Sequence, residues 1–175
     1  MIDMKRCETR DLPRMQEFYQ LVIRETEDMS QNARWEYGKH PTKEMIENYV
    51  RQGMMYYVDT GKEIAAAVVV TPFQTSEYHG VNWHIVLKDN EVTVVHLLAV
   101  NPHCQKHGYA KAIMHEVIDL AKRNRMKAIR LDALECNKPA HKLYESLGFR
   151  KRDTRHWYAE NTGWFDFDLY EYCLS

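Results

Sequence analysis

Residues 91–134 hold two apolar segments joined by an amphipathic one, and this arrangement constrains the fold more than any other part of the sequence. The segment EVTVVHLLAV is rich in β-branched residues, as is typical of a buried strand, and KAIRLDAL is a second strand candidate. Between them, YAKAIMHEVIDLAKRNR has apolar residues at helical spacing. Strands connected through a helix lie parallel in a sheet. The segment therefore predicts a strand–helix–strand unit with parallel strands.

The rest of the chain predicts further strands and helices around this unit. We expect a strand at 2–7, a helix at 9–26, a helix at 42–53 that Thr42 caps, a hairpin at 54–73, a short helix at 138–149 and two strands within 156–174. Residues 31–41 are expected to be irregular, and residues 74–90 to form a loop or a weak strand pair. The order predicts an α/β fold, a mixed sheet with helices on both faces.

Length and composition narrow the class of protein. A chain of 175 residues fits one domain, 1–175, with a sizeable core. With 24 basic and 25 acidic residues it has no general attraction to nucleic acid or to an anionic membrane. No apolar run reaches the ~18–20 residues that span a bilayer, and the first residues, MIDMKRCETRD, lack the apolar core typical of a signal peptide. Four cysteines without paired spacing favour a reduced, cytoplasmic protein.

The stretch NPHCQKHGYAKAIM, residues 101–114, allows two interpretations. His103, Cys104 and His107 lie within five positions, as in a metal site, but no second ligand pair with matching spacing accompanies them, and His79 and His84 are the nearest candidates. Alternatively, Gly108 frees a turn that opens a helix, whose unpaired N–H groups and dipole suit a pyrophosphate. A plain connector between strand and helix explains the glycine equally simply. We expect no metal.

A second motif lies further on: NKPAHKLYESLGF, Asn137 to Phe149. Together with HLLAVNPHCQKHGYAKAIM it resembles the GNAT superfamily of acyl-CoA-dependent N-acetyltransferases. That family shows Leu-x-Val-x-Pro, then Gln/Arg-x-x-Gly-x-Gly/Ala, then Asn and a helix ending Tyr-x-x-x-Gly-Phe. The matching residues are Leu98, Val100, Pro102, Gln105, Gly108, Ala110, Asn137, Tyr144, Gly148 and Phe149. Ala110 replaces the second glycine. The resemblance implies a GNAT-like, mostly antiparallel sheet whose parallel pair lies at the cofactor site.

The resemblance also implies acetyl-CoA as the cofactor and a set of residues that contact it. Backbone groups of the strand end would pair with the pantetheine arm, the turn would hold the pyrophosphate, and Asn137 would bind the arm or fix diverging strands. Lys142, with Lys138 and His141, would reach the ribose phosphate or face solvent. The expected cofactor contacts are Leu98, Ala99, Val100, Gln105, Lys106, His107, Gly108, Tyr109, Ala110, Lys111, Asn137 and Lys142.

Tyr144 occupies the position where many family members keep a tyrosine that protonates the leaving thiolate. The chemistry suits a phenol, because its ordinary pKa of ~10 lies above the ~8.5 of a thiol, so it carries a proton to give at neutral pH. The alternative is a tyrosine that only packs on the apolar face of a short helix.

His96 is the candidate base. It lies two residues before Leu98, so strand alternation predicts that it shares a face with Leu98 and Val100 unless a bulge intervenes. His-x-Leu-Ala-Val also resembles the arylalkylamine N-acetyltransferase branch, where a histidine there helps take a proton from the amine. Val94 stands where that branch has a second histidine. The alternative is a histidine satisfied by neighbouring backbone.

Other candidates are weaker, and the identity of the acceptor amine stays open. Glu91 could serve a water relay, and Asp166 and Asp168 share one strand face. The segments where this fold places its acceptor pocket contain four aromatic residues, which could instead pack in the core: Trp35, Tyr37, Tyr78 and Trp83. We expect acetyl transfer to a small-molecule amine in a ternary complex. The alternatives are a protein or peptide amine and a non-catalytic acyl-CoA-binding module. A homodimer is compatible with the fold.

Overall fold

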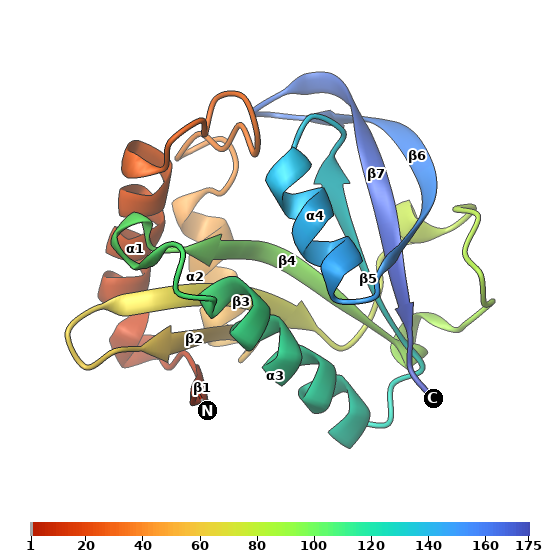
Figure 1. Ribbon diagram of the computed structural model, residues 1–175, viewed down its shortest axis with the longest axis horizontal. Helices are drawn as coiled ribbons and strands as arrows, with labels where there is room; N and C mark the ends of the chain where they lie inside the picture. The colour runs from red at the N-terminus through yellow and green to blue at the C-terminus, as the bar shows by residue number, and fades with distance from the viewer. Residues whose placement is uncertain (1) are drawn as a thin grey trace.

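The computed structural model describes residues 2–175, which form one seven-stranded sheet flanked by four α-helices (Figure 1). The sheet order is β1-β2-β3-β4-β5-β7-β6, and only the β4–β5 pair is parallel. The strands are β1 (Met4–Arg6), β2 (Met55–Asp59), β3 (Ile64–Thr71), β4 (Val92–Val100), β5 (Ala128–Leu134), β6 (Arg150–Ala159) and β7 (Gly163–Cys173). The predicted mixed sheet with one parallel pair is confirmed.

The four helices end close to where their sequence signals place them. They are α1 (Leu12–Glu25), α2 (Lys43–Arg51), α3 (Tyr109–Arg123) and α4 (Lys138–Ser146). The Thr42 hydroxyl accepts from the amide of Met45 at 3.0 Å, as the capping signal predicts, and Pro139 lies in the first turn of α4.

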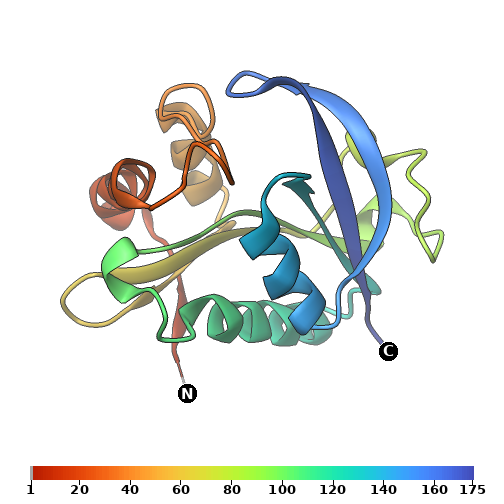
Figure 2. The same ribbon diagram turned by 45° about the horizontal axis from the view of Figure 1, so that its top comes forward.

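The helices α1 and α2 cover one face of the sheet and α3 covers the other (Figure 2), and an apolar core lies on each face. On one face, α1 and α2 bury Met15, Tyr19 and Ile46 against β2, β3 and β4. On the other, α3 and α4 bury Ile113, Met114 and Tyr144 against the same central strands. Because β3 is covered on both faces, all eight of its residues are buried, as its uninterrupted apolar sequence requires.

Residues 72–91 contain no strand and form a loop, which is the first of the two predicted alternatives. They contain the short 3-10 helices η2 (Ser76–Tyr78) and η3 (Asp89–Glu91). The fully buried guanidinium of Arg130, on β5, donates to Glu171 at 2.9 Å, to Gln74 at 2.7 Å and to the carbonyl of Ile85 at 2.6 Å. One buried cation thereby ties this segment to the sheet.

Candidate active site

The strands β4 and β5 separate partway along the sheet. Their parallel pairing covers only Val92–Val94 and Ala128–Arg130, although β4 continues to Val100 and β5 to Leu134. Beyond Val94 the β5-facing edge of β4 has no neighbouring strand. Apart from the carbonyl of Leu97, which accepts from the hydroxyl of Tyr19 at 2.6 Å, backbone groups of this stretch are therefore available to an extended ligand.

A β-bulge lies at the same point in β4. Val69 of β3 pairs with His96 and Ala67 with Ala99, so two residues of β4 oppose one of β3, and Leu97 has φ 50°. A bulge reverses the alternation of side chains beyond it. The prediction that His96 shares a face with Leu98 and Val100 is therefore wrong. His96 stacks on Tyr49 of α2, at 6.1 Å between ring centroids, whereas Leu98 and Val100 pack on the α3 side.

The phosphate turn, residues 105–111, follows β4 and is anchored at its start. The buried amide of Asn101 donates to Glu63 and to the carbonyl of Ile64, both at 3.0 Å, and its side-chain oxygen accepts from the amide of His103 at 2.9 Å. Gly108 then has φ 81°, a conformation that a side chain disfavours.

The phosphate turn presents free N–H groups to an anion. The amide of Ala112 is the first in α3 to find a carbonyl, that of Gly108 at 3.0 Å, so those of Tyr109, Ala110 and Lys111 point out of the helix start. Lys106 and Lys111 add positive charge to the positive end of the helix dipole. An unpaired strand edge followed by such a turn fits an acyl-CoA, which is an extended arm ending in a pyrophosphate.

A cleft of about 1280 Å³ runs from the phosphate turn, past the open edge of β4, into the region under α2 and the β6–β7 hairpin. Both candidate catalytic residues, Tyr144 and His96, line it. All the predicted cofactor residues line it except His107 and Lys142. Both exceptions are exposed side chains, and Nδ1 of His107 lies 2.8 Å from the carbonyl of Gln105. Their contacts with the cofactor stay predictions.

The His/Cys residues of the 101–114 stretch do not converge. His103 lies 2.9 Å from Glu25, and the buried thiol of Cys104 lies 3.6 Å from Glu63. Within residues 2–175 no three His, Cys, Asp or Glu side chains come close enough together to hold a metal ion. Burial, reinforced by Glu63, raises the pKa of the Cys104 thiol, which makes it a poor nucleophile.

Tyr144 projects from α4 between the two sides of the cleft. Its ring packs on Phe149 and Tyr170, and its hydroxyl makes no hydrogen bond to any other residue of the described chain. Burial, and secondarily the charge of Asp132, raises the pKa of the Tyr144 phenol, so it is protonated at neutral pH. The arrangement leaves one O–H group free to donate into the cleft.

His96 lies in the same cleft as a neutral imidazole. Burial lowers its pKa from 6.5 to about 4, and the negative charge of Glu77 offsets this only in part. The ring can accept a hydrogen bond at neutral pH, but it is a weaker base than an exposed histidine.

The motifs missed a carboxylate in this cleft, Asp132 of β5. Its Oδ2 accepts from the hydroxyl of Tyr78 at 2.6 Å, and burial raises the pKa of its carboxyl. His40 and Tyr49 also line the cleft. The available signal was an acidic residue in a central strand whose other residues, apart from Arg130, are apolar; such a position is uncommon unless the carboxylate has a partner or a task.

The remaining candidates lie away from the cleft. Glu91 accepts from the amide of Lys88, Asp166 pairs with His156 at the surface, and the buried Asp168 accepts from Thr154 and pairs with Lys151. Of the four aromatic candidates, Trp35 and Tyr78 line the cleft, whereas Tyr37 and Trp83 do not. Asn137 also lines the cleft, and its side-chain oxygen caps α4 by accepting from the amide of Ala140 at 3.4 Å.

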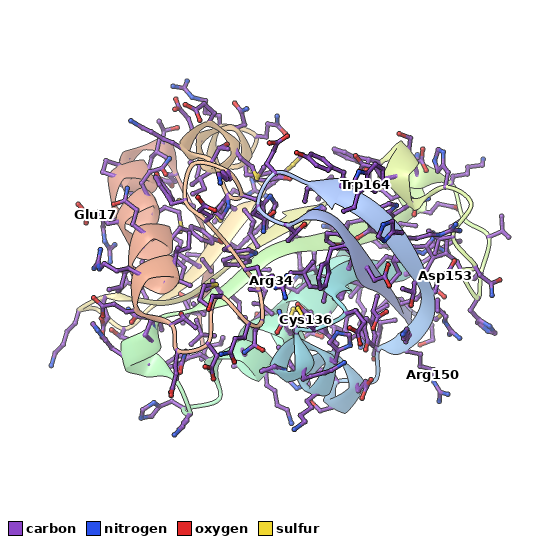
Figure 3. The ribbon with its side chains drawn as sticks, turned by 90° about the horizontal axis from the view of Figure 1, so that it is seen from above. Glu17, Arg34, Cys136, Arg150, Asp153 and Trp164 are labelled. Carbon is purple, nitrogen blue, oxygen red and sulfur yellow. The ribbon has the colours of Figure 1, made fainter. Side chains whose placement is uncertain are left out.

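The segment after α1 roofs the cleft. Asn161, in the β6–β7 turn, donates to the carbonyl of Arg34 at 2.8 Å, and the thiol of Cys136, before α4, lies 3.4 Å from the carbonyl of Asn32. Figure 3 shows Arg34 beside Cys136, with Trp164 on the neighbouring hairpin. The roof therefore joins three elements that are distant in sequence.

No helix within residues 2–175 is long and apolar enough to cross a membrane. A family model described as "Acetyltransferase (GNAT) family" matches residues 15–149. The N-acetylaspartate synthetase of Danio rerio is 38% identical over 64 residues, which are 37% of this chain and 23% of that protein, so the match spans about a quarter of the relative's length.

Two solved structures illustrate the likeness of fold. The ribosomal-protein-S18-alanine N-acetyltransferase of Escherichia coli has a TM-score of 0.69 at 20% identity, covering 100% of this chain and 95% of that one. An acetyltransferase of Salmonella typhimurium with its cofactor acetyl-CoA has a TM-score of 0.72 at 14% identity, with coverage of 100% and 95%.

Proposed function

The chain belongs to the GNAT acetyltransferase family, and we propose that it transfers the acetyl group of acetyl-CoA to a primary amine of a small molecule by direct attack in a ternary complex. The observation that carries the proposal is the single cleft, which joins the phosphate turn to the free hydroxyl of Tyr144 and continues into a roofed pocket. Both substrates fit in one continuous space of about 1280 Å³.

The donor end of the cleft would hold acetyl-CoA. The amides of Tyr109–Lys111 and the side chains of Lys106 and Lys111 would bind the pyrophosphate, and the edge of β4 from His96 to Val100 would pair with the pantetheine arm. Acetyl-CoA supplies a thioester, whose carbonyl carbon is the electrophile.

Tyr144 would supply the proton that the departing sulfur needs. Its phenol is protonated at neutral pH, faces the cleft and is not engaged by another described side chain. His96 would accept a hydrogen bond from the acceptor amine, since its imidazole is neutral and lines the same cleft. No acyl-enzyme is needed, and the buried thiol of Cys104 is not activated for one.

The roof supports a small acceptor over a protein. Its contacts through Asn161 and Cys136 tie the segment after α1 to the β6–β7 turn and to the start of α4, which narrows the room for a peptide chain that extends from the amine.

A thiol-release screen tests the proposal. Purified protein and acetyl-CoA are combined with alkylamines, arylalkylamines, polyamines, amino acids and short peptides, with subtraction of the amine-independent release. We expect turnover with at least one small amine and none with peptides. Tight binding of acetyl-CoA without release in any arm would instead indicate a non-catalytic acyl-CoA-binding module.

A further inference from the structure

The acceptor end of the cleft has an unusual combination of charge and aromatic surface. Its lining includes the carboxylates of Asp132 and Glu77 together with aromatic side chains from five parts of the chain: Trp35, Tyr49, Phe73, Tyr78, Trp157 and Phe167. The lysines in the lining, Lys106 and Lys111, belong to the phosphate turn. Aromatic faces and carboxylates both favour a cation, and neither favours an anion.

No arginine among the described residues lines this cleft. Arg34 lies between the lining residues Ala33 and Trp35, but its guanidinium stacks over the ring of Phe165, 4.5 Å from the centroid. The histidines at this end, His40 and His96, have pKa values lowered by burial, so they are neutral at pH 7. A substrate carboxylate would find no cationic partner here, and its burial would be costly.

Asp132 is the carboxylate built into the wall. Its side chain is partly exposed to the cleft, and the hydroxyl of Tyr78, itself buried, holds one of its oxygens at 2.6 Å. The ring of Tyr78 is fixed in turn by stacking on Trp157, at 6.2 Å between centroids, and by packing on Trp83. The pair lies near enough to the Tyr144 phenol for the charge of Asp132 to act on it. Glu77, by contrast, is exposed.

We propose that the acceptor is a primary ammonium without a carboxylate, and that Asp132, oriented by Tyr78, binds its nitrogen and takes one proton from it before attack. This inference rests on the proposed acetyl transfer and adds the class of acceptor and the proton acceptor. The proposed acceptor differs from the one implied by the name of the Danio rerio relative, N-acetylaspartate synthetase, because N-acetylaspartate carries two carboxylates.

The proton and electron pairs balance as follows. The ammonium gives a proton to Asp132, and the lone pair it leaves on nitrogen forms the N–C bond to the thioester carbonyl carbon. The C–S bond breaks with its electron pair on sulfur, which takes the proton of Tyr144. The nitrogen then gives up a second proton, which restores the phenol through the cleft, and Asp132 releases its proton to solvent. The products are the N-acetyl amine, the free thiol and one proton.

Matched substrates test the class of acceptor. The rate of thiol release is measured with 2-phenylethylamine, with phenylalanine, which adds only the carboxylate beside the amine, and with aspartate. We expect kcat/KM for 2-phenylethylamine to exceed that for either amino acid by at least ~100-fold. A preference for phenylalanine or aspartate would overturn the inference while leaving acetyl transfer intact. If no amine in any class is acetylated, the proposed function fails, and the inference fails with it.

The variant Asp132→Asn tests the residue, with Asp119→Asn, an exposed carboxylate on α3, as the matched control. We expect Asp132→Asn to raise KM for 2-phenylethylamine and to lower kcat, each by ~10-fold or more, with an unchanged Kd for acetyl-CoA. The control should leave all three constants unchanged. Wild-type kcat/KM in a folded Asp132→Asn protein would overturn the assignment.

Tyr78→Phe gives a second measurement that does not depend on the folding of the first variant. The hydroxyl of Tyr78 lowers the pKa of Asp132, so its removal raises that pKa further. A base works only when deprotonated, so the acidic limb of kcat/KM should move to higher pH. A role confined to packing would leave the limb in place, and an unmoved limb would contradict Asp132 as the proton acceptor.

Discussion

Replacing His96 with glutamine should flatten the dependence of stability on pH. In the folded chain burial lowers the pKa of His96 from 6.5 to about 4, so between these values the unfolded chain binds the extra proton. Stability is therefore fully present above pH 6.5 and is lost as the pH falls toward 4. At about 1.4 kcal/mol per pH unit, the difference between the unfolded and folded pKa values of His96 corresponds to a loss of about 3 kcal/mol in the free energy of unfolding.

The assay is urea unfolding at a series of pH values between 7 and 4, for wild type, His96→Gln and His115→Gln. His115 is an exposed histidine on α3 and serves as the control. We expect the wild type and the control to lose about 3 kcal/mol more across this range than His96→Gln does. Burial also lowers the pKa of His40 in all three proteins, and the charge of His96 lowers it further, so His96→Gln removes that smaller effect as well and flattens the curve in the same direction. Parallel curves for wild type and His96→Gln would refute the buried, neutral imidazole.

Three further substitutions test other parts of the account. Tyr144→Phe should lower turnover by ~10- to 1000-fold without weakening the binding of acetyl-CoA, because only the proton donor is lost. Unchanged turnover would remove Tyr144 from the mechanism. Gly108→Ala should lower the free energy of unfolding in urea by ~1 kcal/mol, because the φ of 81° disfavours a side chain even though no atom lies within 4 Å of the added Cβ. It should also weaken the binding of acetyl-CoA in calorimetry. An unchanged affinity for acetyl-CoA would argue against a phosphate site. Arg130→Met should lower the free energy of unfolding by ~3 kcal/mol, because it leaves the buried Glu171 without its closest partner. The control Arg10→Met, which removes a surface ion pair, should change it little. A similar loss in both variants would refute the buried ion pair.

The sequence predicts the elements well because their signals are local. The Thr42 cap, the helical spacing in α3 and the β-branched run in β4 each depend on neighbouring residues, and each element forms where expected. The parallel β4–β5 pair follows from the intervening helix. The sequence of residues 74–90 allows a loop or a weak strand pair, because the structure of this segment depends on contacts with Arg130, 40 residues or more away.

The donor end of the site could be predicted, whereas the acceptor end could not. The phosphate turn is a contiguous motif, but the acceptor pocket draws on the roof, α2, η2, β5 and the β6–β7 hairpin, which only the fold brings together. Asp132 is one acidic residue in a strand, and no nearby residue in the sequence indicates that Tyr78, 54 positions away, is its hydrogen-bond partner. The bulge at Leu97 likewise has no local signal, so strand alternation alone predicts the wrong face for His96.

The most direct test of the central claim is the initial rate of amide formation measured while acetyl-CoA and 2-phenylethylamine are both varied. Direct attack in a ternary complex predicts double-reciprocal lines that intersect, with the N-acetyl amine formed in step with the free thiol. Parallel lines would show that the acetyl group passes first to the protein, and thiol release without the acetylated amine would show that no transfer occurs.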